Sequence, residues 1–370
     1  MISTNIKYLP ALDHIRAIAA ILILMFHGQQ LFTNKFLFND VVPSDFWITT
    51  KNPLFSIIFE GHTAVALFMV LSGFVFTYGA LGYEVNYGLY IRNRLLRIYP
   101  LFVFLIFVGI YIFRDKFSFL SMLQSLLTFS NITGALEIGP FSSMFWAISV
   151  EFQFYLIFPF LLVFFQKEGS KYLIMVICLA IMFRVVAFSL GSNVRDVSYW
   201  TILGRIDQFV IGMLTAKIFI ETKLGDRFWR MILPISVLAT ILLLFVFNNL
   251  GGWPVIKAWK IIWPTVEGLF WAVFLLSYSK LIRENSNWVL RTLSKIGEIS
   301  FSIYLLHFIV LQILLVKGWY FSFNISPLKN AFINSFFILM PVTILMAVFS
   351  YNTIEKPFLQ MRRRYLSERK

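Results

Sequence analysis

Long apolar runs recur along the whole length of this chain and constrain its fold more than any other feature. Each run has roughly 18 or more residues, the length an α-helix needs to cross the hydrocarbon core of a bilayer. The composition agrees, because 59% of the 370 residues are hydrophobic and only 14% are charged, whereas a soluble domain is about 45–50% apolar. The sequence therefore predicts an all-α, polytopic membrane helical bundle.

We place about ten transmembrane helices and treat residues 1–370 as a single membrane domain with no appended soluble domain. The predicted spans cover residues 9–32, 61–81, 97–113, 147–166, 171–190, 201–220, 230–248, 263–281, 299–317 and 330–353. Between the third and fourth spans, the segment 117–130 reads as a short interfacial or re-entrant helix, and a full span there stays open.

Basic residues predict the orientation of the bundle. Nineteen of the 32 Lys and Arg residues fall in the tails and loops on the side of the N-terminus, and nine fall in the opposite loops. Because cytoplasmic loops carry an excess of Lys and Arg, both termini are predicted to be cytoplasmic. The net charge of +14 then points to inner loops and membrane lipids and not to nucleic acid. The tail "MRRRYLSERK" is interpreted as an anchor at the inner surface.

The first predicted helix, "LDHIRAIAAILILMFHGQQ", carries Arg16 and His27, although ionisable groups inside a span are costly and suggest function. Eleven residues are about three helical turns, or roughly 16 Å, so the two side chains share a face. Asp13 lies three residues before Arg16, close enough to pair with it. His27 suits proton transfer near pH 7, and a hydrogen bond to a neighbouring helix is the alternative. His14 is expected to be solvated or beside lipid headgroups.

A basic segment, "YIRNRLLRIYP", precedes the third predicted span. Arg94 and Arg97 are three residues apart and share a helical face. Paired guanidinium groups suit a phosphate through bidentate contacts, and ordinary anchoring at the inner membrane surface explains them equally well. Pro100 marks either a kink or the start of the span.

The fourth predicted span, "FWAISVEFQFYLIFP", contains Glu151, with Tyr155 four residues later on the same face. A carboxylate there must be paired or share a proton. It could orient a histidine or bind a substrate hydroxyl. It could equally neutralise Arg184 or Arg205.

Polar residues in other spans give weaker signals. Ser300, Tyr304 and His307 form one stripe along an otherwise apolar helix, "ISFSIYLLHFIV". Ser72 and Gly73, in "LFMVLSGFVF", are typical of close helix packing.

Three negative expectations complete the survey of single residues. His62 is expected to be solvated at the mouth of the second span, and Cys178, the single cysteine, to be a packing residue. No zinc-binding spacing, Gly-rich phosphate loop or nucleophile elbow occurs in the sequence, so no metal is expected.

Five segments, taken in order, resemble the acyltransferase-3 family of membrane acyltransferases. "LPALDHIRAIAAILILMFH" looks like the family's first helix, with an Arg, ten residues and a His. "LFMVLSGFVFTYG", the RxxR segment "IRNRLLRIYPLF", "MFWAISVEFQFYLIFPFLL" and the Y-L-x-H segment "SFSIYLLHFIVL" match later motifs. Ala147 stands where the family usually has Ser, and Phe152 where Glu is common, which places any second carboxylate in doubt.

The resemblance implies transfer of an acyl group, commonly acetyl from acetyl-CoA, to hydroxyls of extracytoplasmic glycans or other small molecules. In that scheme His27 is the base, and Glu151 orients it or holds the acceptor. Arg94 and Arg97 hold the phosphates of the donor, and Arg16 either contacts the donor or only pairs with Asp13. Possible supporting residues are Asp13, Ser72, Tyr155, Tyr304 and His307. Acetyl-CoA is then a substrate, and no cofactor is bound permanently.

The resemblance also places the protein in a bacterial inner membrane, with a lipopolysaccharide, capsule or exopolysaccharide sugar as the acceptor. A proton-coupled transporter of a glycan precursor or small anion is the alternative, because buried His, Glu and Arg also serve as proton relays. Against it, the chain shows no paired half-repeats. A glycan polymerase or ligase ranks third, because the outer loops are modest. The acceptor's identity, the acyl chain length and the oligomeric state stay undetermined.

Overall fold

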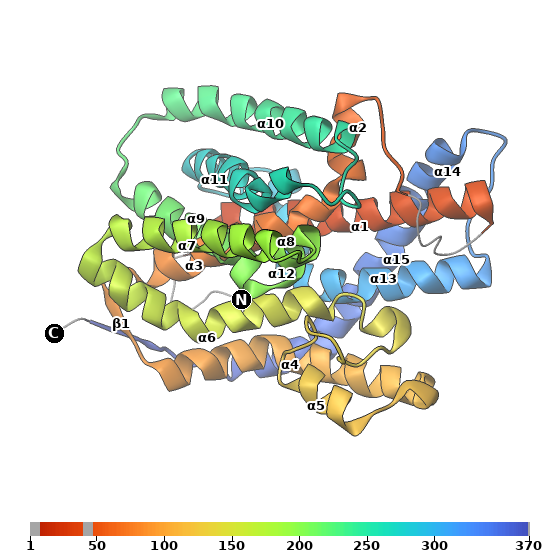
Figure 1. The fold of residues 1–370 in the computed structure, drawn as a ribbon, viewed down its shortest axis with the longest axis horizontal. Helices are drawn as coiled ribbons and strands as arrows, with labels where there is room; N and C mark the ends of the chain where they lie inside the picture. The colour runs from red at the N-terminus through yellow and green to blue at the C-terminus, as the bar shows by residue number, and fades with distance from the viewer. Residues whose placement is uncertain (1–7, 40–46, 369–370) are drawn as a thin grey trace.

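The computed structural model of the protein describes residues 8–39 and 47–368. They form an almost entirely helical bundle whose long helices run roughly along one direction (Figure 1). The predicted all-α fold class is therefore confirmed. Lys7, Arg369 and Lys370, which contributed to the predicted orientation, lie outside the described residues.

The elements follow one another along the chain in two halves. The first half contains α1 (Pro10–Phe38), α2 (Pro53–Phe59), the 3-10 helix η1 (Gly61–Thr63), α3 (Ala64–Ala80), β1 (Tyr83–Val85), α4 (Tyr87–Ile112), η2 (Arg114–Lys116), α5 (Phe119–Leu126), η3 (Gly139–Phe141), α6 (Phe145–Glu168) and α7 (Ser170–Ser189). The second half contains α8 (Val194–Trp200), α9 (Ile202–Glu221), α10 (Asp226–Asn249), η4 (Ala258–Ile261), α11 (Trp263–Leu281), α12 (Trp288–Glu298), α13 (Ser300–Lys317), α14 (Pro327–Asn334), the π-helix η5 (Ser335–Leu339), α15 (Met340–Ser350), the π-helix η6 (Tyr351–Glu355), α16 (Lys356–Gln360) and β2 (Leu366–Glu368).

Every predicted span coincides with a helix or a continuous run of helices. Among the described residues, eight helical segments are long and apolar enough to cross a membrane. The remaining two predicted spans correspond to α9 and α11, which are 20 and 19 residues long but are not among those eight. In α9 the polar residues Arg205, Asp207 and Gln208 are buried inside the bundle, so this helix faces other helices and not lipid.

Three local expectations are corrected or refined. Pro100 lies inside α4, which begins at Tyr87, so it does not mark the start of the helix. The segment 117–130 contains only the eight-residue helix α5 and does not span a bilayer. Cys178 is exposed on α7, a helix whose most apolar stretch is only 17% buried. Its thiol is therefore directed away from the bundle core.

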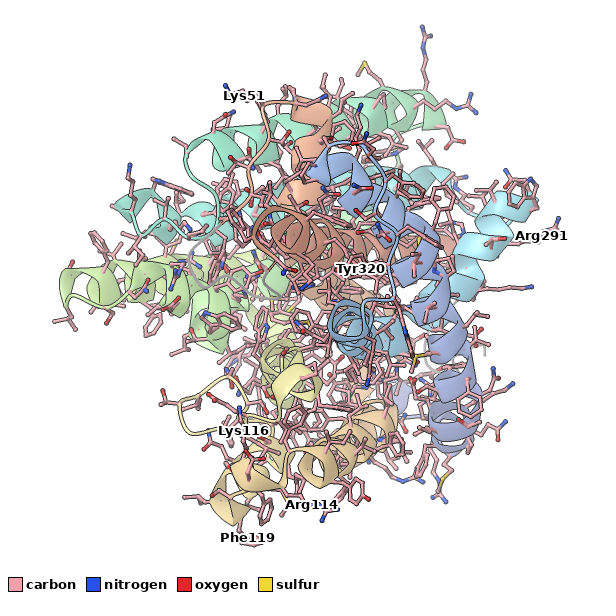
Figure 2. The ribbon with its side chains drawn as sticks, turned by 90° about the vertical axis from the view of Figure 1, so that its right-hand side faces the viewer. Lys51, Arg114, Lys116, Phe119, Arg291 and Tyr320 are labelled. Carbon is pink, nitrogen blue, oxygen red and sulfur yellow. The ribbon has the colours of Figure 1, made fainter. Side chains whose placement is uncertain are left out.

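The connections group at two ends of the bundle. β1 and the α6–α7 and α9–α10 connections lie at one end of Figure 1, and α5 and α14 lie toward the other. Figure 2 looks at this second end, where Lys51, Arg114 and Lys116 are labelled. The three connections at the first end, which were predicted to lie on one side of the membrane, are therefore opposite α5, which belongs to a loop predicted for the other side.

The centre of the bundle is formed by α3 and α9, which approach closely through glycines. A Cβ atom added to Gly73 would lie 1.9 Å from the carbonyl oxygen of Phe209, and one added to Gly212 would lie 2.0 Å from the carbonyl oxygen of Val70. No larger side chain fits at either position. The predicted close helix packing at Gly73 is therefore confirmed, and it holds α3 in place against the rest of the core.

The C-terminal tail folds back across the start of α4. β2 pairs antiparallel with β1, with Glu84 opposite Ser367. The side chain of Asn93 on α4 donates to the carbonyl oxygen of Arg363 at 2.6 Å, and its Oδ1 accepts from the backbone N–H of Arg363 at 3.1 Å. The tail is thus a docked strap, and the interpretation of it as a simple surface anchor was incomplete.

Candidate active site

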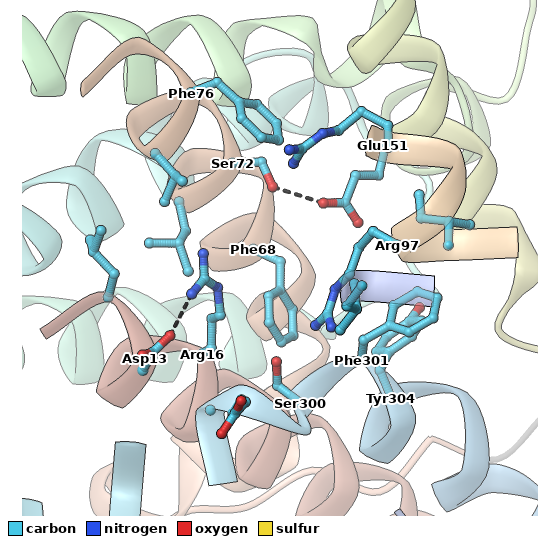
Figure 3. A pocket seen from close by; sticks show the side chains of 18 of the residues that line it. Asp13, Arg16, Phe68, Ser72, Phe76, Arg97, Glu151, Ser300, Phe301 and Tyr304 are labelled. Carbon is cyan, nitrogen blue, oxygen red and sulfur yellow. Dashed lines mark hydrogen bonds and ion pairs between the residues drawn. The ribbon is translucent and has the colours of Figure 1, made fainter. Parts of the chain in front are cut away.

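A cavity of about 550 Å³ lies beside the start of α1, the first half of α4 and Arg362 of the C-terminal tail, and Figure 3 shows it from close by. It combines an apolar wall with an unusual concentration of charged side chains. Its charged and hydroxyl-bearing lining comprises Tyr8, Asp13, Arg16, Ser72, Arg94, Arg97, Glu151, Tyr155, Ser294, Lys295, Glu298, Ser300, Tyr304, Tyr351 and Arg362. Helices from both halves of the chain thus bring together eight of the ten predicted site residues, leaving out the two histidines.

The two arginines of the RxxR segment are held in different ways. The Arg94 guanidinium packs over the rings of Phe76 and Tyr155, with its central carbon 4.7 and 5.8 Å from the ring centroids. Its Nε atom is buried and has no hydrogen-bond partner among the described residues. Arg97 lies 3.6 Å from the carboxylate of Glu355 and packs over Phe301. Both positive groups therefore face the cavity without a tight bidentate partner.

Glu355 is a site residue that sequence reasoning missed. Its side chain is 0% exposed, accepts a hydrogen bond from Ser302 and pairs with Arg97. The π-helical turn η6 directs it inward from the last span, and such π-helical turns are frequent at functional sites. Glu355 lies two residues beyond the predicted span 330–353, so it was not considered among the acids inside a span.

Arg16 lines the cavity opposite Arg97, with Phe68 between them (Figure 3). Its Nη1 donates to Oδ1 of Asp13 at 2.5 Å, which confirms the predicted pairing with Asp13. The Arg16 side chain remains 32% exposed. Pairing with Asp13 and facing the cavity are thus compatible roles for one side chain.

Glu151 is held by two hydroxyl groups. Ser72 donates to its Oε1 at 2.8 Å, and Tyr155 donates to the same oxygen. Among the described residues Oε2 makes no hydrogen bond, so it is available to a bound molecule. The predicted proximity of Glu151 and Tyr155 is therefore confirmed, the contact from Ser72 was not predicted, and Glu151 does not bond to a histidine.

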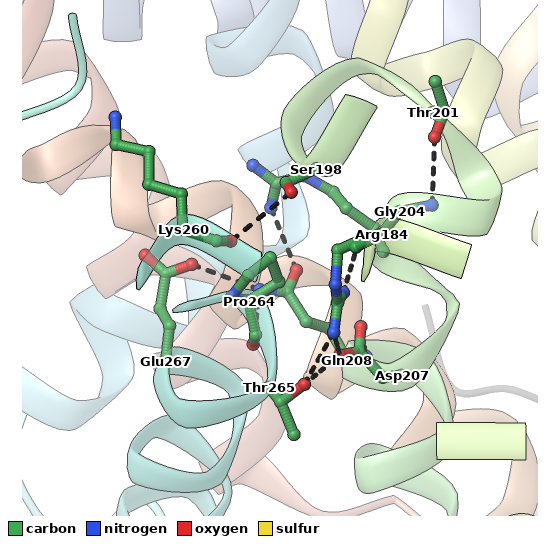
Figure 4. Close-up of polar contacts among 11 residues, drawn as sticks. Arg184, Ser198, Thr201, Gly204, Asp207, Gln208, Lys260, Pro264, Thr265 and Glu267 are labelled. Atoms are coloured by element: carbon green, nitrogen blue, oxygen red, sulfur yellow. Dashed lines mark hydrogen bonds and ion pairs between the residues drawn. The ribbon is translucent and has the colours of Figure 1, made fainter. Parts of the chain in front are cut away.

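The alternative in which Glu151 neutralises Arg184 or Arg205 is wrong, because both arginines have other partners, and Figure 4 shows those of Arg184. Arg184 donates to Asp207 at 2.8 Å, and both side chains are 0% exposed. Arg205 donates to the side chain of Gln208 at 2.9 Å and to the carbonyl oxygen of Tyr199 at 2.8 Å. Both arginines are thus paired with residues of α8 and α9, and Glu151 faces the cavity without pairing with either of them.

His27 and His307 form a pair beyond the cavity. Nδ1 of His27 lies 3.0 Å from Nε2 of His307. His307 is fully buried, and its Nδ1 lies 3.1 Å from the carbonyl oxygen of Ile303. His307 is one turn along α13 from Tyr304, which lines the cavity, and the two ring centroids are 5.9 Å apart. The histidine pair therefore lies just behind the wall that Tyr304 forms.

These contacts assign the protons of two neutral rings. A carbonyl oxygen can only accept, so Nδ1 of His307 carries the proton and its Nε2 is an acceptor. Nδ1 of His27 must then be the donor, which leaves Nε2 of His27 unprotonated. Among the described residues this atom makes no hydrogen bond. The hydrogen-bond network thus presents Nε2 of His27 as a free base.

Tyr304 supplies a hydroxyl at the same place. Its side chain is 6% exposed, and its hydroxyl has no hydrogen-bond partner among the described residues. Buried hydroxyl groups are normally bonded. An unpartnered hydroxyl on the cavity wall, next to a histidine pair, is suited to a ligand oxygen.

The C-terminal strap adds a further arginine to the cavity. Arg362 lines it together with Arg94 and Arg97. Burial and, secondarily, the charges of Arg97 and Arg94 lower the pKa of Arg362 to about 10. Burial is the main cause of this shift, and the smaller effect of Arg97 and Arg94 reflects the positive charges that share the cavity and suit an anion.

Two histidines that were expected to be solvated are buried. His14 is 0% exposed, and its Nε2 lies 2.8 Å from Oδ1 of Asn285. His62 is 5% exposed, and its Nε2 lies 3.0 Å from Glu60. Both expectations were wrong, because the position of a residue near the end of a span does not show which loops and helices cover it.

Comparison with known proteins agrees with the geometry. Residues 9–352 match the acyltransferase-3 family model, described as an acyltransferase domain. Curated relatives named "putative O-acetyltransferase" occur in Staphylococcus aureus strains COL, MRSA252 and N315. Each is 25% identical to this chain over 96% of its length. The chain spans 58% of the length of these relatives, and no solved structure matches it. On the match over residues 9–352, the chain belongs to the acyltransferase-3 family.

Proposed function

We propose that this protein is a membrane O-acyltransferase that moves an acyl group, most simply acetyl, from acyl-CoA to a hydroxyl of a glycan. The observation that carries the proposal is the arrangement along α1 and its neighbours. Arginines line a cavity at one end, and a histidine with a free Nε2 lies behind its wall, about 16 Å of helix from Arg16.

The cavity suits a coenzyme A thioester. Such a donor carries phosphates at one end and a thioester at the far end of a narrow arm. Arg94, Arg97 and Arg16 supply guanidinium groups for the phosphates, and Arg362 adds a fourth. The apolar wall, with Phe68 and Ile148, suits the arm. We assign this end of the bundle to the cytoplasm, where acyl-CoA is made, in agreement with the distribution of basic loops.

The chemistry follows from the histidine pair. Nε2 of His27 removes the proton from the acceptor hydroxyl while its oxygen attacks the thioester carbonyl carbon. The developing imidazolium keeps its Nδ1–H bonded to Nε2 of His307. The C–S bond then breaks, and the thiolate leaves with the proton that His27 had taken. His307 is a positioning residue that holds His27 in the required tautomer.

The negative charge on the carbonyl oxygen needs a hydrogen-bond donor. The unpartnered hydroxyl of Tyr304 is the nearest candidate on the cavity wall. Glu151 does not orient His27 in this scheme, because its hydrogen bonds run to Ser72 and Tyr155. We assign its free Oε2 to a polar group of a bound substrate.

The acceptor is assigned from the side on which its hydroxyl would reach His27. A hydroxyl that reaches His27 from the end of the bundle away from the arginines belongs to a molecule on the extracytoplasmic side. An exported or lipid-linked saccharide of a bacterial envelope fits that position, with the protein in the inner membrane.

The test uses membranes containing the protein and acetyl-CoA labelled in the acetyl group. We expect alkali-labile label to appear in envelope glycan, because an oxygen ester is hydrolysed by base. Membranes from cells lacking the protein serve as the control. Equal label in both membrane preparations would contradict the proposal.

A further inference from the structure

A second group of side chains lies at the end of the bundle away from β1 and β2 and is not used by the donor. We call it the distal cluster. It consists of the partly exposed rings of Trp47, Tyr199, Trp200 and Trp253 and the buried pair Glu60 and His62. The rings come from the segment before α2, the end of α8 and the α10–α11 connection.

The rings of the distal cluster lie close to one another, and the guanidinium groups of Arg195 and Arg205 pack over Trp253 and Tyr199. Trp253 lies 5.8 Å from Trp47, 5.9 Å from Tyr199 and 6.3 Å from Trp200 between ring centroids. The planes of Trp47 and Trp253 are inclined by only 30°. Aromatic rings that remain partly exposed offer flat apolar area together with a polar edge.

A buried acid and a histidine lie directly beside these rings. Glu60 is 0% exposed and accepts from Asn248 at 2.9 Å, and from Trp47 at 3.4 Å. Its other oxygen lies 3.0 Å from Nε2 of His62. The His62 ring is 5.6 Å from that of Tyr199. Carboxylate, imidazole and aromatic ring thus converge on one small region.

Two buried polar atoms in this region have no partner among the described residues, namely Nδ1 of His62 and Nε1 of Trp253. In the neutral tautomer whose Nε2–H donates to the carboxylate of Glu60, Nδ1 of His62 is an acceptor. Nε1 of Trp253 is a donor. Leaving such buried groups unpaired is unfavourable. A hydroxyl, which both donates and accepts hydrogen bonds, can bond to either atom.

The distal cluster also adjoins the catalytic histidine. Phe26, the residue before His27, lies 5.6 Å from both Trp47 and His62 between ring centroids. The ring of Phe26 is 4.7 Å from that of His27. Phe26 therefore connects the distal cluster to the proposed base, on the side that the donor does not use.

We propose that the distal cluster binds a pyranose ring of a saccharide. A pyranose has a face of C–H groups that packs on aromatic rings and a rim of hydroxyls that bond to carboxylate, imidazole and indole. The unpartnered polar atoms disfavour a purely apolar ligand at this position. That this saccharide is the acyl acceptor rests on the proposed function.

The test measures binding directly and needs no acyl-CoA. The protein is placed in lipid nanodiscs free of sugar detergents. Saturation-transfer NMR is then recorded with methyl glycosides of glucose, galactose, mannose, rhamnose and N-acetylglucosamine. We expect saturation of the ring C–H protons of at least one glycoside. Trp253→Ala should weaken that glycoside's binding at least tenfold, and Trp253→Phe, which keeps a ring, should weaken it less.

Trp319→Ala is the matched control, because Trp319 is 62% exposed at the end of α13 and outside the distal cluster. It should bind as the wild type does. His62→Leu, which removes the acceptor Nδ1, gives a second variant should Trp253→Ala fail to fold. No saturation of any glycoside by the wild type would overturn the proposal. So would unchanged binding by a folded Trp253→Ala or, where that variant does not fold, by His62→Leu.

The same nanodiscs separate the two proposals. Transfer of label from acetyl-CoA in a protein that binds no glycoside would contradict the saccharide site and support the acyltransferase. Glycoside binding by a protein that neither binds nor consumes acetyl-CoA would contradict the proposed acyltransferase function and support the saccharide site.

Discussion

Nδ1 of His27 donates to Nε2 of His307 across 3.0 Å, and this contact joins the first helix of the bundle to α13. The two residues are 280 positions apart in the chain. Because His307 is itself bonded to the carbonyl oxygen of Ile303, its Nε2 can only accept. The pair therefore fixes the tautomer of His27 and orients its free nitrogen.

Replacement of His307 tests this relay. His307→Leu removes the acceptor for Nδ1 of His27, so we expect kcat to fall about 10- to 100-fold, with the KM for acyl-CoA little changed. His307→Gln can still accept a hydrogen bond through its amide oxygen, so its kcat should fall less. The measurement is steady-state label transfer by purified variants. Equal losses in the two variants would indicate a role in packing alone.

Arg97 and Glu355 are predicted to be coupled energetically. Arg97→Ala leaves the buried carboxylate of Glu355 without its cation, which should cost about 3–5 kcal/mol of stability and raise the KM for acyl-CoA. Glu355→Gln alone should cost less. The double variant should be more stable than Arg97→Ala and should keep the high KM. Thermal unfolding and donor kinetics of the three variants measure both effects, and strictly additive losses would contradict the pairing.

The C-terminal strap is predicted to contribute to donor binding. Arg362→Ala removes a guanidinium from the cavity lining and should raise the KM for acyl-CoA about five- to tenfold, with kcat nearly unchanged. Arg364, which is exposed and absent from the lining, provides the matched control as Arg364→Ala. Identical donor kinetics for the two variants would exclude Arg362 from the site.

Lys260 predicts a specific pH dependence of stability. Burial, followed by the charge of Arg195, lowers the pKa of Lys260 from 10.5 to about 8. Between these values the unfolded chain binds a proton that the folded protein has released. Stability should therefore rise by about 1 kcal/mol per pH unit from pH 8 toward pH 10.

The comparison with Lys260→Met isolates this contribution from other groups that titrate in the same range. Thermal unfolding of both proteins between pH 7 and pH 10 gives the difference. We expect the wild type to gain stability relative to the variant as the pH rises. A constant difference would show that Lys260 keeps its ordinary pKa.

Much of the fold follows from the sequence, because the need to satisfy backbone groups in lipid leaves a long apolar run few options besides a helix. Spacing along one helix also predicted local contacts, such as that between Asp13 and Arg16 and that between Glu151 and Tyr155. The charged residues of the cavity could also be predicted, since a charged group inside a span is usually paired or functional.

Contacts between distant segments were not predictable in this way. Nothing in the spacing of α13 places His307 against His27, and the π-helical turn that directs Glu355 to Arg97 has no clear sequence pattern. The burial of His14 and His62 depends on how loops and neighbouring helices fold over the helix ends. The docking of the tail on Asn93 likewise requires the tertiary structure, because it pairs segments about 270 residues apart.

The central claim is that Nε2 of His27 accepts the proton of the acceptor hydroxyl during acyl transfer. The most direct measurement is single-turnover label transfer from acetyl-CoA by wild type and His27→Ala, each normalised to the amount of donor bound. We predict that His27→Ala binds the donor as the wild type does and transfers label 10²- to 10⁴-fold more slowly. A folded His27→Ala protein that transfers label at the wild-type rate would contradict the account.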